Sequence, residues 1–134
     1  MYSMEFSVKT NEGKHDLCAG VRLIGDDILV AIWGGERPHI GAVAAAQPRP
    51  SLKDSNVTSS SASVICYSGH KEDELAKKTA ETIAADFNTN VVGTAGIHWD
   101  DLPEEGIRRV VENTEILVDL ILRRIRSELG KETE

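Results

Sequence analysis

The sequence predicts an α+β fold: a mixed, mostly antiparallel sheet with two helices packed on one face. Apolar and polar residues alternate through much of the first half of the chain, which is the period of strands with one solvated face. The second half holds two amphipathic segments with helical spacing, separated by one short strand-like segment. We expect all 134 residues to form a single domain, with a frayed polar tail from about residue 130.

Three strands are expected first. Residues 4–10 alternate in polarity, and residues 11–14 have the composition of a turn. Further strands are expected at 17–24 and 28–33, joined by a turn at Gly25. Short connections of this kind favour an antiparallel meander.

The next segment is built from small residues. Residues 39–47 favour a strand in close contact with a neighbour, although alanine also favours a helix. Arg49 lies between two prolines and should be extended. Residues 51–61 are rich in serine and predict a loop, which can act as a lid. Alternation resumes at 62–68.

The first helix is expected to start at Glu72, where three consecutive carboxylates would offset the helix dipole, and to stop at Asn88. A strand at 90–95 follows. Asp100 or Asp101 is expected to cap the second helix, which should end at Gly130.

Composition restricts the function. The net charge of −7 argues against a nucleic-acid partner, whose binding depends on Lys and Arg. No run of about 20 apolar residues predicts a membrane span, and no signal peptide opens the chain, so we expect a cytoplasmic location. Cys18 and Cys66 are expected to be free thiols, since disulfides are rare in the cytoplasm.

Three segments combine glycine with histidine where regular structure is expected to stop, at 34–41, 68–71 and 93–98. Glycine lets backbone approach a ligand closely, and Arg and His supply directional donors. We expect these segments to converge on one site. The candidate site residues are Gly35, Arg37, His39, Gly41, Arg49, Ser51, Ser68, Gly69, His70, Lys71, Gly96 and His98.

Two kinds of ligand suit these residues. His39, His70 and His98 can bind a divalent metal ion, although their spacing matches no local metal motif. Alternatively, Ser68 to Lys71 leads into a helix N-terminus that favours an anion, with Arg37 and Arg49 as phosphate ligands. Each residue also has a plain structural reading, as a loop hydrogen-bonding group or a solvated charge.

Evidence for catalysis is weaker. No serine lies on a Gly-x-Ser-x-Gly elbow. Asp100 and Asp101 can orient His98 as a general base, but helix capping explains them with fewer assumptions. Trp33 and Trp99 adjoin the glycine-rich segments, and either can stack on a planar ring or anchor the core.

The segments 34–43, 48–52, 69–73 and 93–98 together resemble the small D subunit of gallate decarboxylase, of the LpdD-like family of prenylated flavin chaperones. The resemblance spans about Phe6 to the end of the last helix. It implies an accessory protein without turnover that binds prenylated flavin mononucleotide (FMN). It further implies two partners, a UbiX-type prenyltransferase that makes the cofactor and a UbiD-type aromatic-acid (de)carboxylase that receives it.

Two readings from other classes remain open: a small metal-dependent hydrolase or lyase that uses the histidines, and a structural subunit without a ligand. Self-association is also expected, through the small residues 42–46 or the apolar stripe of the last helix.

Overall fold

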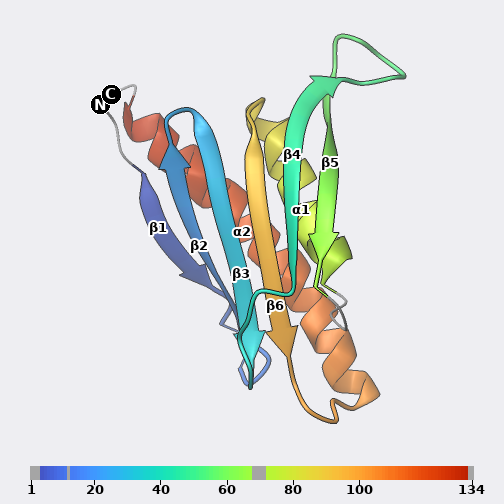
Figure 1. Cartoon of the computed structure of the whole chain (residues 1–134). Helices are drawn as coiled ribbons and strands as arrows, with labels where there is room; N and C mark the ends of the chain where they lie inside the picture. The colour runs from blue at the N-terminus through green and yellow to red at the C-terminus, as the bar shows by residue number, and fades with distance from the viewer. Residues whose placement is uncertain (1–3, 12, 68–71, 133–134) are drawn as a thin grey trace.

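The computed structural model describes residues 4–11, 13–67 and 72–132. Its elements are β1 (Glu5–Lys9), β2 (Leu17–Ile24), β3 (Asp27–Gly35), β4 (Ala42–Pro50), β5 (Thr58–Cys66), α1 (Asp73–Phe87), β6 (Val91–His98) and α2 (Glu104–Glu132). The strands form one sheet, and both helices lie behind it in Figure 1. The predicted α+β class is therefore confirmed.

The strand order is β1-β2-β3-β6-β4-β5. Only β3 and β6 are parallel, and every other neighbouring pair is antiparallel. The first three strands make the predicted meander. Because β6 lies between β3 and β4, the connection at residues 36–41 must cross the end of β6, on the face opposite the helices (Figure 1).

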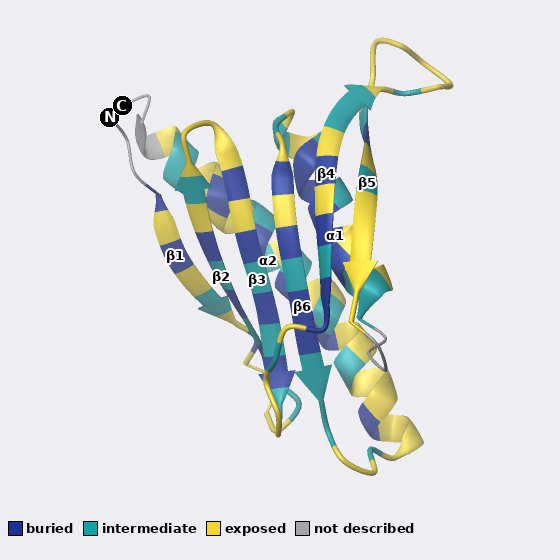
Figure 2. Ribbon diagram, in the orientation of Figure 1, coloured by how far each residue is buried: buried dark blue, intermediate teal, exposed yellow. Residues whose placement is uncertain are grey.

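The core lies between the sheet and the helices. Alternate residues of each central strand are buried there, which gives the banded pattern of Figure 2. The buried side chains of β4 are Ala42, Ala44 and Ala46, and those of α1 include Ala76, Ala80 and Ala84. Small residues on both elements let α1 pack closely on the sheet. The residues predicted as a surface for a partner, 42–46, thus place their even-numbered side chains in the core.

α2 covers the other half of the sheet. Leu117, Ile121 and Ile125 are fully buried and lie at the spacing of one helical face. Their burial contributes about 1.5–3 kcal/mol each to folding. The apolar stripe of the last helix therefore covers β1 and β2 from Leu117 to Ile125, whereas Ile107 and Val111 nearer its start are exposed.

Several boundaries differ from prediction. β3 continues through two glycines to Gly35, and β4 runs from Ala42 to Pro50 rather than over 39–47. The predicted loop at 51–61 was partly wrong, because β5 begins at Thr58. α2 begins at Glu104 and continues through Gly130 to Glu132. At the end of α1, Asn88 adopts the left-handed conformation and its N–H bonds to Ala84, as expected of a helix stop.

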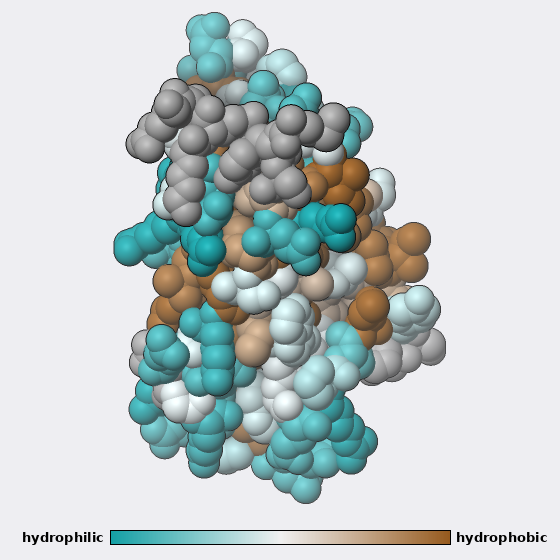
Figure 3. Space-filling view, turned by 90° about the vertical axis from the view of Figure 1, so that its left-hand side faces the viewer, coloured by the Kyte–Doolittle hydropathy of each residue, from teal (hydrophilic) through white to brown (hydrophobic). Residues whose placement is uncertain are grey.

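The surface is mixed in polarity. On the side that carries β1, hydrophilic residues separate several small apolar patches (Figure 3). Among the described residues, no helix is long and apolar enough to cross a membrane.

Candidate functional site

The connection at 36–41 is bonded to the end of β6. The Glu36 and Arg37 N–H groups donate to the His98 carbonyl, at 2.8 and 3.3 Å, and the Gly41 N–H donates to Ala95 at 2.9 Å. Two of the predicted glycine–histidine segments therefore meet at the carboxyl end of β3 and β6. We call residues 35–41 and 96–100 the loop cluster.

Two glycines make this contact sterically feasible. Gly35 has φ = 89°, and a Cβ there would lie 2.1 Å from the His98 carbonyl oxygen. A Cβ on Gly96 would lie 1.6 Å from the carbonyl oxygen of His39. Both glycines were predicted to allow close approach. The group that comes close to them is the backbone of the chain itself, at His98 and His39.

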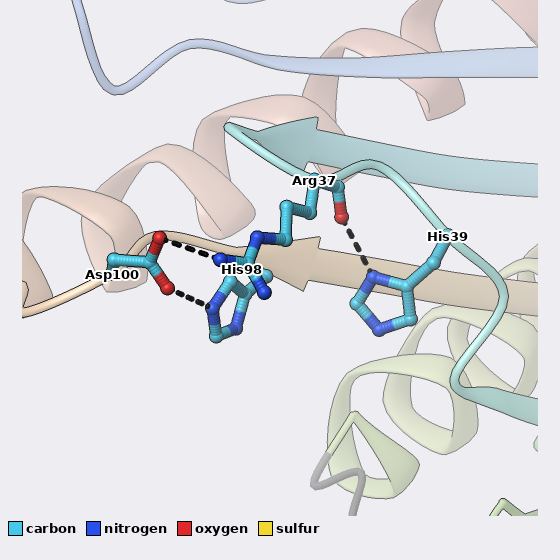
Figure 4. Close-up of polar contacts among 4 residues, drawn as sticks. All are labelled: Arg37, His39, His98 and Asp100. Atoms are coloured by element: carbon cyan, nitrogen blue, oxygen red, sulfur yellow. Dashed lines mark hydrogen bonds and ion pairs between the residues drawn. The ribbon is translucent and has the colours of Figure 1, made fainter.

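Asp100 connects two of the predicted site residues (Figure 4). The Arg37 guanidinium donates from Nη2 to Asp100 Oδ2 at 2.9 Å, and His98 Nε2 lies 2.9 Å from Oδ1. The hydrogen bond from His98, helped by the positive charge of Arg37, lowers the pKa of Asp100 below its ordinary value. Asp100 was predicted as a helix cap or an orienting group for His98; it contacts His98 and holds Arg37 as well.

His39 is held by a second carboxylate. Its Nδ1 donates to the Arg37 carbonyl at 2.8 Å, and its Nε2 lies 2.9 Å from Oε1 of Glu72. The same Glu72 oxygen accepts the Ile97 N–H at 3.3 Å. Glu72 precedes α1, so it ties that helix both to β6 and to the connection at 36–41.

The histidines were also predicted as metal ligands. In residues 4–11, 13–67 and 72–132, no group of three or more His, Cys, Asp or Glu side chains is arranged to hold a metal ion. His39 and His98 face different carboxylates. Ser68, Gly69, His70 and Lys71 lie outside the described residues, so the three-histidine site stays a prediction.

Arg49 and Ser51 lie away from the loop cluster. Arg49 is eight residues beyond Gly41 along β4, which corresponds to about 27 Å of extended strand. Its side chain donates to the Ser61 hydroxyl at 2.6 Å and to the Pro50 carbonyl at 3.0 Å. The hydroxyl of Ser51 accepts the Lys53 N–H in the following turn. The structure thus separates these two predicted residues from Arg37, His39 and His98.

A hollow of about 470 Å³ adjoins the loop cluster on the side of β1 and β2. Its lining includes Lys9, Lys14, Cys18, Trp33, Gly35, Glu36, Pro38 and Trp99, together with Asp16. We call it the Trp33 hollow. Lys9, Cys18, Trp33 and Gly96 are successive partners across β1, β2, β3 and β6. Sequence reasoning noted the tryptophans but missed the lysines: the strand register aligns Lys9 with Trp33, and the turn after β1 supplies Lys14.

The charges in the hollow are mixed. Lys9 Nζ lies 3.8 Å from Asp16 Oδ2, and Glu36 stands near the rim. The two lysines that line the hollow are therefore accompanied by two carboxylates, Asp16 and Glu36. A second hollow of about 430 Å³ lies at the opposite end of β3, β4 and β6, lined by groups such as Leu29, Ala45 and Val92.

Comparison with known proteins gives one family match and one solved structure with a similar fold. A family model described as the prenylated flavin chaperone LpdD-like domain matches residues 11–126. A solved structure titled as a novel chaperone complex for yeast 20S proteasome assembly has a TM-score of 0.61 and 20% identity, covering 97% of this chain and 100% of that chain. At that identity the likeness concerns the fold alone. No curated protein matches.

Proposed function

Because the chain belongs to the LpdD-like family of prenylated flavin chaperones, whose model covers residues 11–126, we propose that it binds prenylated FMN. Its role is to keep the cofactor for a UbiD-type aromatic-acid (de)carboxylase and to help load that enzyme. A UbiX-type prenyltransferase is the proposed donor. The protein carries the cofactor and does not turn it over.

The observation that carries the proposal is the Trp33 hollow beside the loop cluster. Its volume lies within the range of about 300–1,000 Å³ typical of small-molecule sites. An indole can stack on a planar heteroaromatic ring, and Trp33 and Trp99 both line the space. The residues present therefore fit the flavin part of the cofactor.

The phosphate has a candidate ligand in Arg37. One of its five N–H donors bonds to Asp100, while 69% of the side chain remains exposed to solvent. Asp100 limits the positions that the guanidinium can take, so less side-chain entropy is lost on binding. Lys9 and Lys14 add positive charge on the opposite side of Trp33. An open, shallow site of this kind suits a carrier, which must release its cofactor to a partner.

The direct test is titration of the protein with FMN and with prenylated FMN, followed by flavin absorbance and by quenching of tryptophan fluorescence. We expect prenylated FMN to bind. Arg37→Ala should weaken binding about 10- to 100-fold, which corresponds to the loss of a hydrogen bond to a charged group. Arg49→Ala is the control, because it removes a half-buried arginine at the other end of β4, and it should leave affinity unchanged.

Maturation needs its own assay. The assay mixes apo-decarboxylase with the prenyltransferase and its substrates and measures how fast decarboxylase activity appears. We expect activity to appear faster with the wild-type protein than with the Arg37→Ala variant. Failure of the wild-type protein to bind prenylated FMN would overturn the proposal. A larger loss with Arg49→Ala than with Arg37→Ala would move the site to the opposite end of the sheet.

A further inference from the structure

The strand β5 is an edge of the sheet without the usual protection. Its nine residues, Thr58–Cys66, include no charged residue, proline or glycine, and they pair one to one with β4 without a bulge. Edge strands normally carry such features because an unblocked edge pairs with other strands. The opposite edge, β1, is only five residues long and carries Glu5 and Lys9. Figure 2 shows β5 exposed along most of its length.

The hydrogen-bond phase of β5 follows from the bonds at its two ends. The Tyr67 N–H donates to the Gly41 carbonyl at 2.8 Å, and the Ser51 N–H donates to Val57 at 2.8 Å. Odd-numbered residues therefore bond to β4, since bonding alternates along an antiparallel pair. Ser60, Ala62 and Val64 consequently direct their N–H and C=O groups away from the sheet.

We propose that β5 pairs antiparallel with β5 of a second copy of this chain, around a two-fold axis at Ala62. In that register Ser60 of each copy faces Val64 of the other, and Ala62 faces Ala62. These pairs are all in the outward phase, so six backbone hydrogen bonds form together. The two six-stranded sheets become one of twelve strands.

The side chains favour a second copy as the occupant. An isologous interface brings the same surface together from both sides, so it must be self-complementary. Ser61 of each copy would lie opposite Ser63 of the other, and serine pairs can hydrogen-bond across strands. β5 itself carries no charged side chain, so its own residues oppose no like charges, although the chain as a whole carries −7 and Arg49 of β4 contacts Ser61. The proposal does not depend on cofactor binding.

Sedimentation velocity across a range of protein concentrations tests it. The wild-type protein should form a dimer. Two double variants change the same exposed positions: Ser61→Lys with Ser63→Lys opposes like charges twice, and Ser61→Glu with Ser63→Lys opposes unlike charges twice. The first should raise the dimer dissociation constant at least tenfold, and the second should stay near the wild-type value.

Ala62→Pro is an independent test. It removes an N–H group at the axis of each copy, yet that group makes no bond to β4, so the monomer should keep its fold. Circular dichroism checks this, and sedimentation should show the dimer lost. A monomeric wild-type protein would overturn the proposal, as would a dimer equally stable in both double variants, because its copies would then meet through another surface.

Discussion

Gly96 is the residue at which the loop cluster has least room. The backbone of His39 passes over it, so that even a methyl group would lie 1.6 Å from a carbonyl oxygen. Backbone cannot yield as a flexible side chain can. The contact also buries Gly96, although the residue lies on the face of the sheet that the helices do not cover.

We therefore expect Gly96→Ala to lower the free energy of unfolding by about 1–3 kcal/mol, as overpacking does, and to displace the connection at 36–41. Urea denaturation measures the first effect. Gly20→Ala is the control, since a Cβ there would lie 3.5 Å from the Trp33 ring, an ordinary contact, and little stability should be lost. Equal losses in the two variants would contradict the crowding described here.

Asp100 gives a pH prediction. Its pKa is lowered below 3.8, chiefly by the hydrogen bond from His98 and further by the charge of Arg37. A lowered pKa favours the folded state above the unfolded pKa, and that contribution is lost as the pH falls through the lowered value. The Arg37 contact should thus persist at neutral and mildly acid pH.

NMR titration of the Asp100 carboxyl carbon measures this pKa directly. His98→Ala should raise it towards the ordinary value, because the largest cause of the shift is removed. Lys53→Ala, far along the chain and with no part in the contact, should leave it unchanged. An unshifted pKa in the wild-type protein would contradict the geometry.

At the residue scale the sequence predicted the glycines and histidines that meet, because Gly35, Gly96, His39 and His98 all lie near the start or end of a strand-like segment. It also offered Asp100 as a partner for His98, but it did not predict the carboxylate partner of His39. Glu72 comes from a different element, and only the tertiary structure places it beside His39. Arg49 was grouped with Arg37 because both were expected to lie in segments outside regular structure. In the structure, the length of β4 separates them.

At the scale of elements, Glu72 holds the start of α1 in position through contacts with β6 and with the connection at 36–41. The carboxylate lies beside His39 and accepts the Ile97 N–H, so it joins a helix, a strand and a connection. α1 has no side-chain cap bond at its first residues. The tertiary contacts of Glu72 therefore position the start of α1 without bonding to the N–H groups of its first turn.

Glu72→Ala should cost about 1–3 kcal/mol, since a partly buried donor loses its acceptor, and should speed amide hydrogen exchange at 36–41 and at Ile97. Glu74→Ala is the matched control: it removes an exposed first-turn carboxylate and should cost about 0.3–1 kcal/mol through the helix dipole. Exchange that is no faster in Glu72→Ala would show that the connection is held in another way.

Strand and helix types were predictable where polarity alternates or follows helical spacing, as in β2 and α1. The start of β5 was not. Serine has a weak strand preference, and the four serine or threonine residues from Thr58 to Ser61 looked like loop until β4 supplied their hydrogen bonds. The sequence also failed to predict that β3 continues through Gly34 and Gly35. These two residues have no strand preference of their own, and they extend the strand because they pair with β6.

For the whole molecule, the strand order joins the two halves. β6 pairs with β3 of the first half and with β4 of the second, and the two helices share the same face of the sheet. The buried residues of both halves belong to one cluster in the part of the chain that the structure describes. Sequence patterns predicted the layers and the meander, but no local signal revealed that β6 enters the middle of the sheet.

We therefore expect cooperative two-state unfolding. Tryptophan fluorescence reports the end of the sheet that holds Trp33 and Trp99, and far-ultraviolet circular dichroism reports both helices. In urea the two transitions should coincide. Separate midpoints would show that the halves unfold independently.

The same strand order determines when the loop cluster can form during synthesis. The loop cluster needs β3, the connection after it, and the end of β6, which lie some sixty residues apart in the chain. On the ribosome, β1 to β5 are synthesised before β6, the strand that lies between β3 and β4 in the folded sheet. A nascent polypeptide therefore lacks the proposed site, which is complete only once the chain has been synthesised beyond residue 100.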